Sequence, residues 1–264
     1  MSVFLSIIMI LGCEKDPETI LQIVEVPGPT VTVEVPVPPS EYEFTREGVS
    51  TVYYSGQTTR LNQHDELKSA MNSTESTKEG ILAMLNDGTG FIDSTLDGSK
   101  KIGNKTAINS ANSATNKATI ESWIIEFTDV VAPAVVAQTD ASAGVAGSVS
   151  DAGGGSRTGT KVNAKGLEMN QVFSKALIGA FNLDQIINAN GSFGYVTAPK
   201  LNPVASDNDT GVMHYTSPGA SVANVTKMEH YWDEGFGYLY GQDNQYAPAL
   251  GQGGLLNDYL GNVS

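Results

Sequence analysis

The stretch LEMNQVFSKALIGAFNLDQII, residues 167–187, decides the fold class. Its apolar side chains recur at intervals of three and four residues, the spacing that gathers them on one face of an α-helix. That face needs an apolar partner, and other stretches of the chain share its periodicity. The stripe consists of Val172, Phe173, Ala176, Leu177, Ala180 and Phe181. The pattern predicts a helix that packs in a bundle.

Three further helices are predicted ahead of this segment. The first covers residues 62–72 behind an asparagine N-cap. The second starts at Ser76, where Glu79 completes a capping box. The isoleucine and leucine residues of this helix are expected to face inward. The third covers residues 115–137, and Pro133 is expected to kink or end it because proline removes a backbone donor and its ring clashes with the preceding turn.

The segments between these helices are long and irregular. Residues 138–166 are rich in Ala, Ser and Gly, and residues 188–225 carry Asn, Gly, Pro and Asp at turn spacing. Strand signals are few and short, with residues 51–54 as the clearest. The fold class that follows is all-α, a helical bundle with long irregular loops over residues 42–264.

The N-terminus carries the pattern of a secreted, lipid-anchored protein. Residues 3–11 are almost wholly apolar, a run too short for a membrane span but of the length of a signal-peptide core. It ends in Ile-Leu-Gly-Cys, which resembles the lipobox of bacterial lipoproteins. Cys13 is the only cysteine, so it is the expected lipidation site after removal of residues 1–12. The competing interpretation is a buried N-terminal helix.

Residues 13–41 have the composition of a tether. The tetrapeptide Val-Glu-Val-Pro occurs at residues 24–27 and again at 33–36. Because each proline fixes φ and removes a backbone donor, this segment cannot sit inside a sheet. It is predicted to be an extended, polyproline-like spacer. The alternative is a valine-rich edge strand.

Charge and motifs exclude several classes of function. The formal net charge of the 264-residue chain is −14, which repels phosphate backbones and excludes nucleic acid as the expected partner. The three histidines do not form a His-Glu-x-x-His zinc site, and there is no Gly-x-Ser-x-Gly nucleophile motif. A phosphate-binding loop is likewise absent from the sequence.

One segment, KMEHYWDEGFGYLYG at residues 227–241, brings candidate ligands together. On a helix starting near Thr226, His230, Asp233 and Glu234 are at positions i, i+3 and i+4, hence on one face. An imidazole with two carboxylates can bind a metal ion or transfer protons. The competing interpretation is a structural His–carboxylate pair.

The same segment is rich in aromatic residues. We expect these side chains to enclose the cluster and exclude water from it. The candidate ligand-binding residues among them are Trp232 and Tyr238.

Two stretches carry a resemblance to known proteins. Val52–Leu61 (VYYSGQTTRL) resembles the start of an uncharacterised family of bacterial lipoproteins, and the resemblance includes His230–Tyr238 (HYWDEGFGY). The second stretch looks like the Gly-x-His-x-x-Glu signature of imelysin-like proteins, helical-bundle proteins linked to iron uptake. His230 matches the signature histidine and Asp233 the acidic position, with Glu234 beside it, whereas Met228 replaces the signature glycine. Related chains continue past this motif, so we expect a chain that ends at Ser264 to be truncated.

The resemblance implies a lipid-anchored protein of the outer membrane that faces the periplasm or the cell surface. The leading hypothesis is a non-enzymatic lipoprotein that binds a metal ion, an iron complex or a partner in iron acquisition. The second is a metal-dependent, peptidase-like hydrolase that uses His230, Asp233 and Glu234. The third is a structural or adhesive surface protein.

Overall fold

The structure is a computed structural model. It describes residues 19–24, 31–36, 41–46, 48–98, 100–106, 112–151, 155–187, 194–196, 213–217, 220–241, 249–251 and 254–263. The predicted signal peptide and Cys13 lie outside these residues. In the described part of the chain, no helix combines the length and apolar character needed to cross a membrane.

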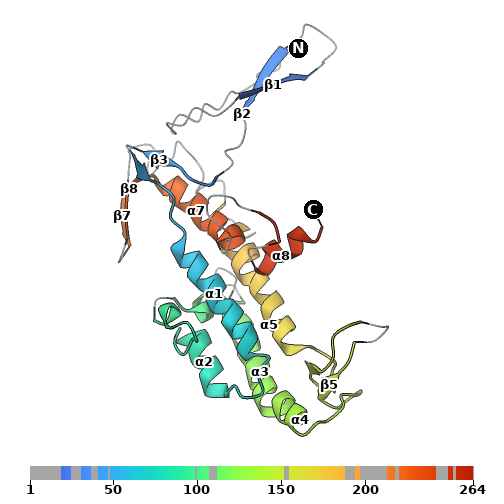
Figure 1. Cartoon of the computed structure of the whole chain (residues 1–264). Coiled ribbons are helices and arrows are strands. Elements are labelled where there is room, and N and C mark those ends of the chain that lie inside the picture. Colours follow the sequence, from blue (N-terminus) through green and yellow to red (C-terminus); the bar gives the residue numbers. More distant parts are fainter. Residues whose placement is uncertain are drawn as a thin grey trace.

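The described chain is mostly helical, as predicted (Figure 1). Helix α1 packs against α2, α5 and α7, and α3 packs against α2 and α5, so α1 and α5 form the centre of the bundle. The α-helices are α1 (Ser55–Ala70), α2 (Lys78–Asn86), α3 (Ser113–Glu126), α4 (Ala132–Val136), α5 (Met169–Ile178), α7 (Lys227–Tyr240) and α8 (Leu255–Gly261). Two 3₁₀ turns, η1 (Ser94–Leu96) and η2 (Ile102–Lys105), lie between α2 and α3.

Two of the predicted helices contain π-helical segments. The third predicted helix is α3, then the π-helix η3 (Phe127–Val131), then α4. The π-helical turn ends two residues before Pro133, where the proline ring would clash with a regular α-turn. The helix continues through Pro133 to Val136, so the proline does not end it at that position. The segment that decided the fold class forms α5 followed by the π-helix η5 (Gly179–Ile187).

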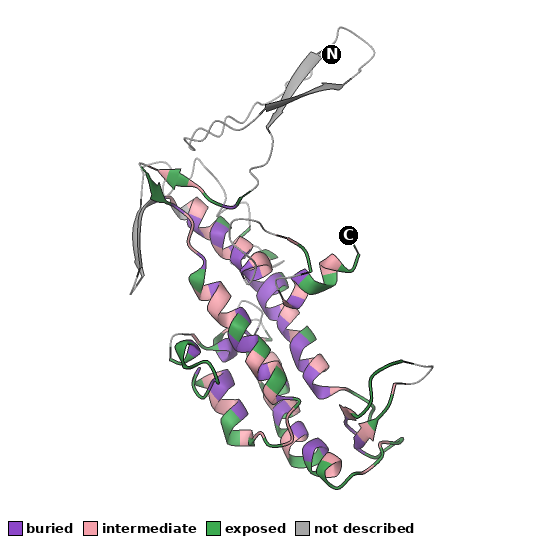
Figure 2. Ribbon diagram, in the orientation of Figure 1, coloured by how far each residue is buried: buried purple, intermediate pink, exposed green. Residues whose placement is uncertain are grey.

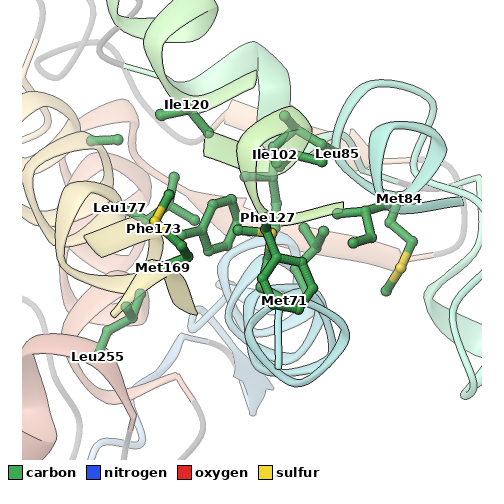
Figure 3. Packing of buried hydrophobic residues seen from close by; sticks show 14 of the residues in the cluster. Met71, Met84, Leu85, Ile102, Ile120, Phe127, Met169, Phe173, Leu177 and Leu255 are labelled. Carbon is green, nitrogen blue, oxygen red and sulfur yellow. The ribbon is translucent and has the colours of Figure 1, made fainter. Parts of the chain in front are cut away.

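The core is one apolar cluster between these helices (Figures 2 and 3). Phe127 of η3 and Phe173 of α5 are fully buried, and Met71 at the end of α1 packs in the same cluster. Four members of the predicted stripe, Phe173, Leu177, Ala180 and Phe181, are buried and the other two are half-buried. The apolar periodicity therefore identified the inward face correctly.

Two helix starts differ from the prediction. Helix α1 begins at Ser55 and not at Asn62, because its first turns bury Gln57 and Leu61 and are held by packing on α7. The side chain of Thr77, not that of Ser76, caps α2 by accepting a hydrogen bond from the backbone N–H of Gly80 at 3.1 Å.

The tether contains a strand pair and is not polyproline-like throughout. Strand β1 (Thr19–Val24) pairs antiparallel with β2 (Val31–Pro36), with Leu21 opposite Glu34. The β-branched residues favour this pairing, and the proline of β2 falls at the end of the ladder, where a missing donor costs little. Because a two-stranded sheet consists of edges only, the alternative of a valine-rich edge strand describes this segment better.

The long loops contain short hairpins that the sequence did not reveal. Strands β5 (Gly147–Val149) and β6 (Thr160–Val162) pair within the first loop, and β7 (Met213–Ser217) pairs with β8 (Ala220–Val225) within the second. The strand expected at residues 51–54 is not formed. Instead β3 (Thr45–Arg46) pairs with β4 (Val49–Ser50) just before it, and β4 contacts β8.

Candidate functional site

The motif of residues 227–241 forms α7, and its first turn is fixed by a capping box. The Thr226 hydroxyl accepts a hydrogen bond from the Glu229 backbone N–H at 3.2 Å, while the Glu229 carboxylate accepts one from the Thr226 backbone N–H at 2.7 Å. This reciprocal pair satisfies two donors that a helix start leaves free. The predicted start of the helix at Thr226 is therefore confirmed.

Glu229 also joins α7 to the N-terminal strand pair. Arg46 of β3 donates two hydrogen bonds to its carboxylate, at 2.6 and 3.1 Å. Burial alone would raise the pKa of Glu229, but the hydrogen bonds from Arg46 and Thr226 outweigh burial and lower it. Glu229 is thus an ionised structural residue that points away from the candidate cluster.

Asp233 is buried and forms hydrogen bonds with the segment that precedes α1. Its carboxylate accepts a hydrogen bond from the Tyr42 hydroxyl at 2.6 Å and one from the Tyr53 backbone N–H at 2.8 Å. Burial raises the pKa of Asp233 to about 7, although both hydrogen bonds act in the opposite direction. The Tyr42 ring also stacks on Phe236 of α7, with ring centroids 3.5 Å apart.

His230 and Glu234 form a pair one helical turn apart. His230 Nε2 lies 3.6 Å from Glu234 Oε2, and Gln57 of α1 donates a hydrogen bond to the other carboxylate oxygen at 3.1 Å. Burial lowers the pKa of His230, and the Glu234 carboxylate opposes this shift. A neutral imidazole beside a carboxylate is suited to binding a cation.

The predicted cluster of three is therefore divided. Positions i+3 and i+4 differ by about 100° around a helix axis, and this difference turns Asp233 toward Tyr42 while Glu234 faces α1. Among the described residues, no group of three His, Cys, Asp or Glu side chains gathers closely enough to hold a metal ion. A metal at His230 and Glu234 would need further ligands from another source.

The two predicted aromatic residues have different environments. Trp232 is 50% exposed and does not line the pocket described below, so it does not enclose the cluster as expected. Two positions after His230, it lies on the far side of the helix. Tyr238 is fully buried, where it accepts a hydrogen bond from Arg60 at 3.4 Å; burial raises its pKa to about 12.

A half-open polar pocket of about 200 Å³ adjoins the His230–Glu234 pair. One wall comes from the start of α1, a second from the segment around η2, and a third from α7. The pocket is lined by Tyr53, Gly56, Gln57, Arg60, Lys100, Lys105, Tyr195, His230 and Glu234. Its described lining thus contains one carboxylate and the basic side chains of an arginine and two lysines.

Most of these lining residues were not identified as site residues from the sequence, although the family resemblance included several of them. Tyr53, Gly56, Gln57 and Arg60 all belong to Val52–Leu61, the first stretch of the family resemblance. The second stretch supplies His230 and Glu234. The two stretches, far apart in the chain, therefore meet at one pocket.

The contact between them is close because α7 carries a glycine where it crosses α1. A Cβ atom at Gly237 would lie 2.5 Å from Tyr54 Cβ and 2.9 Å from Gln57 Cβ. No larger residue fits without moving the helices apart. The glycine thus sets the distance between the two pocket walls.

A Ser–His–Asp chain elsewhere in the bundle is structural. His64 Nε2 lies 3.0 Å from Ser174 Oγ, and its Nδ1 lies 3.0 Å from Asp65 Oδ1. His64 and Ser174 are 1% and 3% exposed, so no substrate reaches the hydroxyl. The chain joins α1 to α5.

The fold and the site together define a mostly helical protein with a polar pocket between helices α1 and α7. The family model described as domain of unknown function DUF4856 matches residues 39–264, and the chain belongs to this family. Comparison with curated proteins and with solved structures returned no match.

Proposed function

We propose that this chain is a non-enzymatic lipoprotein of the outer membrane, anchored through Cys13 and facing the periplasm or the cell surface. Its helical domain, which we infer to be imelysin-like, binds an iron complex at the pocket between α1 and α7. The observation that carries the proposal is the meeting of both family stretches at this pocket, with His230 and Glu234 on one of its walls.

An iron complex suits the pocket better than a bare metal ion. His230 and Glu234 supply two donors, and among the described residues no third His, Cys, Asp or Glu side chain joins them in an arrangement that could hold a metal ion. A bound chelator would bring the missing ligands with it. Two protein ligands are then sufficient to select the complex.

The hydrolase alternative relies on all three motif residues. Asp233 is instead engaged by Tyr42 and Tyr53, which favours binding over catalysis. A structural or adhesive surface protein is the remaining alternative, and it requires no ligand at all.

Equilibrium dialysis of the purified full chain against iron(III) citrate tests the proposal, with bound iron measured by elemental analysis. We expect stoichiometric binding by the wild type and at least tenfold weaker binding by Glu234→Gln, because the amide is a poorer metal ligand. Glu75→Gln is the matched control, since Glu75 is exposed and lies outside the pocket.

Absence of iron from the wild-type protein would contradict the proposal and favour the structural alternative. Cleavage of peptide substrates that is lost in Glu234→Gln would favour the hydrolase instead. Retention of iron by Glu234→Gln at wild-type affinity would place the site elsewhere.

A further inference from the structure

The pocket carries an excess of positive charge in a strongly acidic protein. Among the described residues that line it, Arg60, Lys100 and Lys105 are basic, whereas Glu234 is the one carboxylate. The chain as a whole has 29 acidic and 15 basic residues. Basic side chains gathered against this background produce a local positive potential that attracts anions.

Arg60 lines the pocket and is held in place by hydrogen bonds. Its Nη1 donates hydrogen bonds to the Gly56 carbonyl oxygen at 3.3 Å and to the Tyr238 hydroxyl at 3.4 Å. Within the described part of the chain, its buried Nε has no hydrogen-bond partner. A guanidinium group fixed in this way suits carboxylate and phosphate oxygens.

Lys100 and Lys105 approach the pocket from the segment around η2. The Lys100 side chain crosses the first turn of α1 at Gly56, where a Cβ atom would lie 3.1 Å from Lys100 Cε. The structure gives its ammonium group no ion pair with any described acidic residue. Lys105 is positioned by a 2.7 Å hydrogen bond to the neutral side chain of Gln185.

We infer that Arg60, Lys100 and Lys105 bind the carboxylate or phosphate groups of an anionic chelator, whose metal ion faces His230 and Glu234. This inference rests on the proposed function of the same pocket and names the chemical class of its ligand. A bare anion would contact the basic residues but leave His230 and Glu234 without a cation, and a bare cation would be repelled by the three basic residues. A metal ion wrapped in an anionic chelator satisfies both sets of side chains.

Calorimetric titration of the full chain with iron-free citrate and with iron-free pyrophosphate tests the three basic residues without the metal ion. We expect the wild type to bind at least one of these anions, and the preferred anion shows whether carboxylate or phosphate chemistry is recognised. Added salt should weaken binding, because the attraction is electrostatic and partly exposed to solvent.

The decisive comparison is Lys100→Gln with Lys105→Gln, which should weaken anion binding at least tenfold. Lys101→Gln with Lys165→Gln removes the same charge from exposed positions outside the pocket and should bind like the wild type. Lys100→Gln alone breaks no hydrogen bond between the ammonium group and a described residue. It should still weaken binding severalfold if the double variant unfolds.

Failure of the wild type to bind either anion, or equal binding by the pocket and control variants, would overturn the inference. If iron binding depends on Glu234 but not on the lysines, the proposed function stands and the inference about the basic residues is wrong. Anion binding through the lysines with no effect of Glu234→Gln on iron would support the anion-binding role of the basic residues but reject the placement of the metal ion at Glu234, and with it the proposed function.

Discussion

The Tyr42 hydroxyl donates a 2.6 Å hydrogen bond to the buried Asp233 carboxylate, across 191 positions of sequence. Asp233 also accepts the Tyr53 backbone N–H, so this one carboxylate fixes both ends of the segment that leads into α1. Tyr53 lines the pocket, and Asp233 thus supports the site without facing it.

Asp233 should make stability depend on pH. Its pKa of about 7 in the folded protein lies above the ordinary 3.8, so the folded state binds its proton more tightly than the unfolded chain does. The stabilisation is fully present below about pH 4 and is lost as pH rises through 7. Between pH 4 and 8, wild type should lose on the order of 2–4 kcal/mol relative to Asp233→Asn, measured by denaturant unfolding.

The Tyr42→Phe variant gives an independent check of this titration. The hydrogen bond from Tyr42 lowers the pKa of Asp233, so its removal should move the midpoint of the stability change to higher pH. Parallel pH profiles for the wild type and Asp233→Asn would contradict the assignment of the titration to Asp233.

The sequence predicted the helices better than it predicted their starts or the site. The apolar spacing of residues 167–187 identified a buried face, and Pro133 identified the disturbed turn, because both are local properties of the chain. The start of α1 depends on packing against α7, which no local pattern records. The missed hairpins depend on pairing partners within loops of weak β-propensity.

The candidate site shows the same division. Helical spacing placed His230 and Glu234 together correctly, since a contact between i and i+4 is local. Asp233 was assigned to the wrong neighbours because its partners, Tyr42 and Tyr53, come from the other end of the chain. Lys100 and Lys105 were not predicted as site residues, because they belong to a segment with no recognisable motif and meet α7 only through the fold.

Gly237→Ala should destabilise the protein by roughly 1–3 kcal/mol in thermal or denaturant unfolding. The added methyl group would collide with Tyr54 and Gln57, whose Cβ atoms are fixed by the backbone of α1. Gly179→Ala is the matched control, because no atom lies within 4 Å of its added Cβ. There, alanine should be neutral or stabilising; equal losses at both positions would argue against close packing of α1 on α7.

The two roles of Glu229 should separate by mutation. Arg46→Gln removes a partly exposed ion pair and should cost about 1 kcal/mol or less. Glu229→Ala also removes the bond to the Thr226 backbone, so it should cost about 1 kcal/mol more. Equal free energies of unfolding for the two variants would show that the hydrogen bond from the Thr226 backbone to the Glu229 carboxylate contributes nothing.

Cys13→Ala should abolish lipid attachment, because Cys13 is the only cysteine. Metabolic labelling with a fatty acid should mark the wild type alone, and the variant should leave the detergent phase on partitioning. Acyl label that persists in the variant would reject anchoring through this residue.

Anomalous diffraction from crystals of the Cys13→Ala full chain grown with iron(III) citrate tests the central claim most directly. The account predicts an iron peak bound by His230 and Glu234, with the chelator's oxygens on Arg60, Lys100 and Lys105. An iron peak at another position, or a pocket empty of both iron and chelator at saturating ligand, would contradict it.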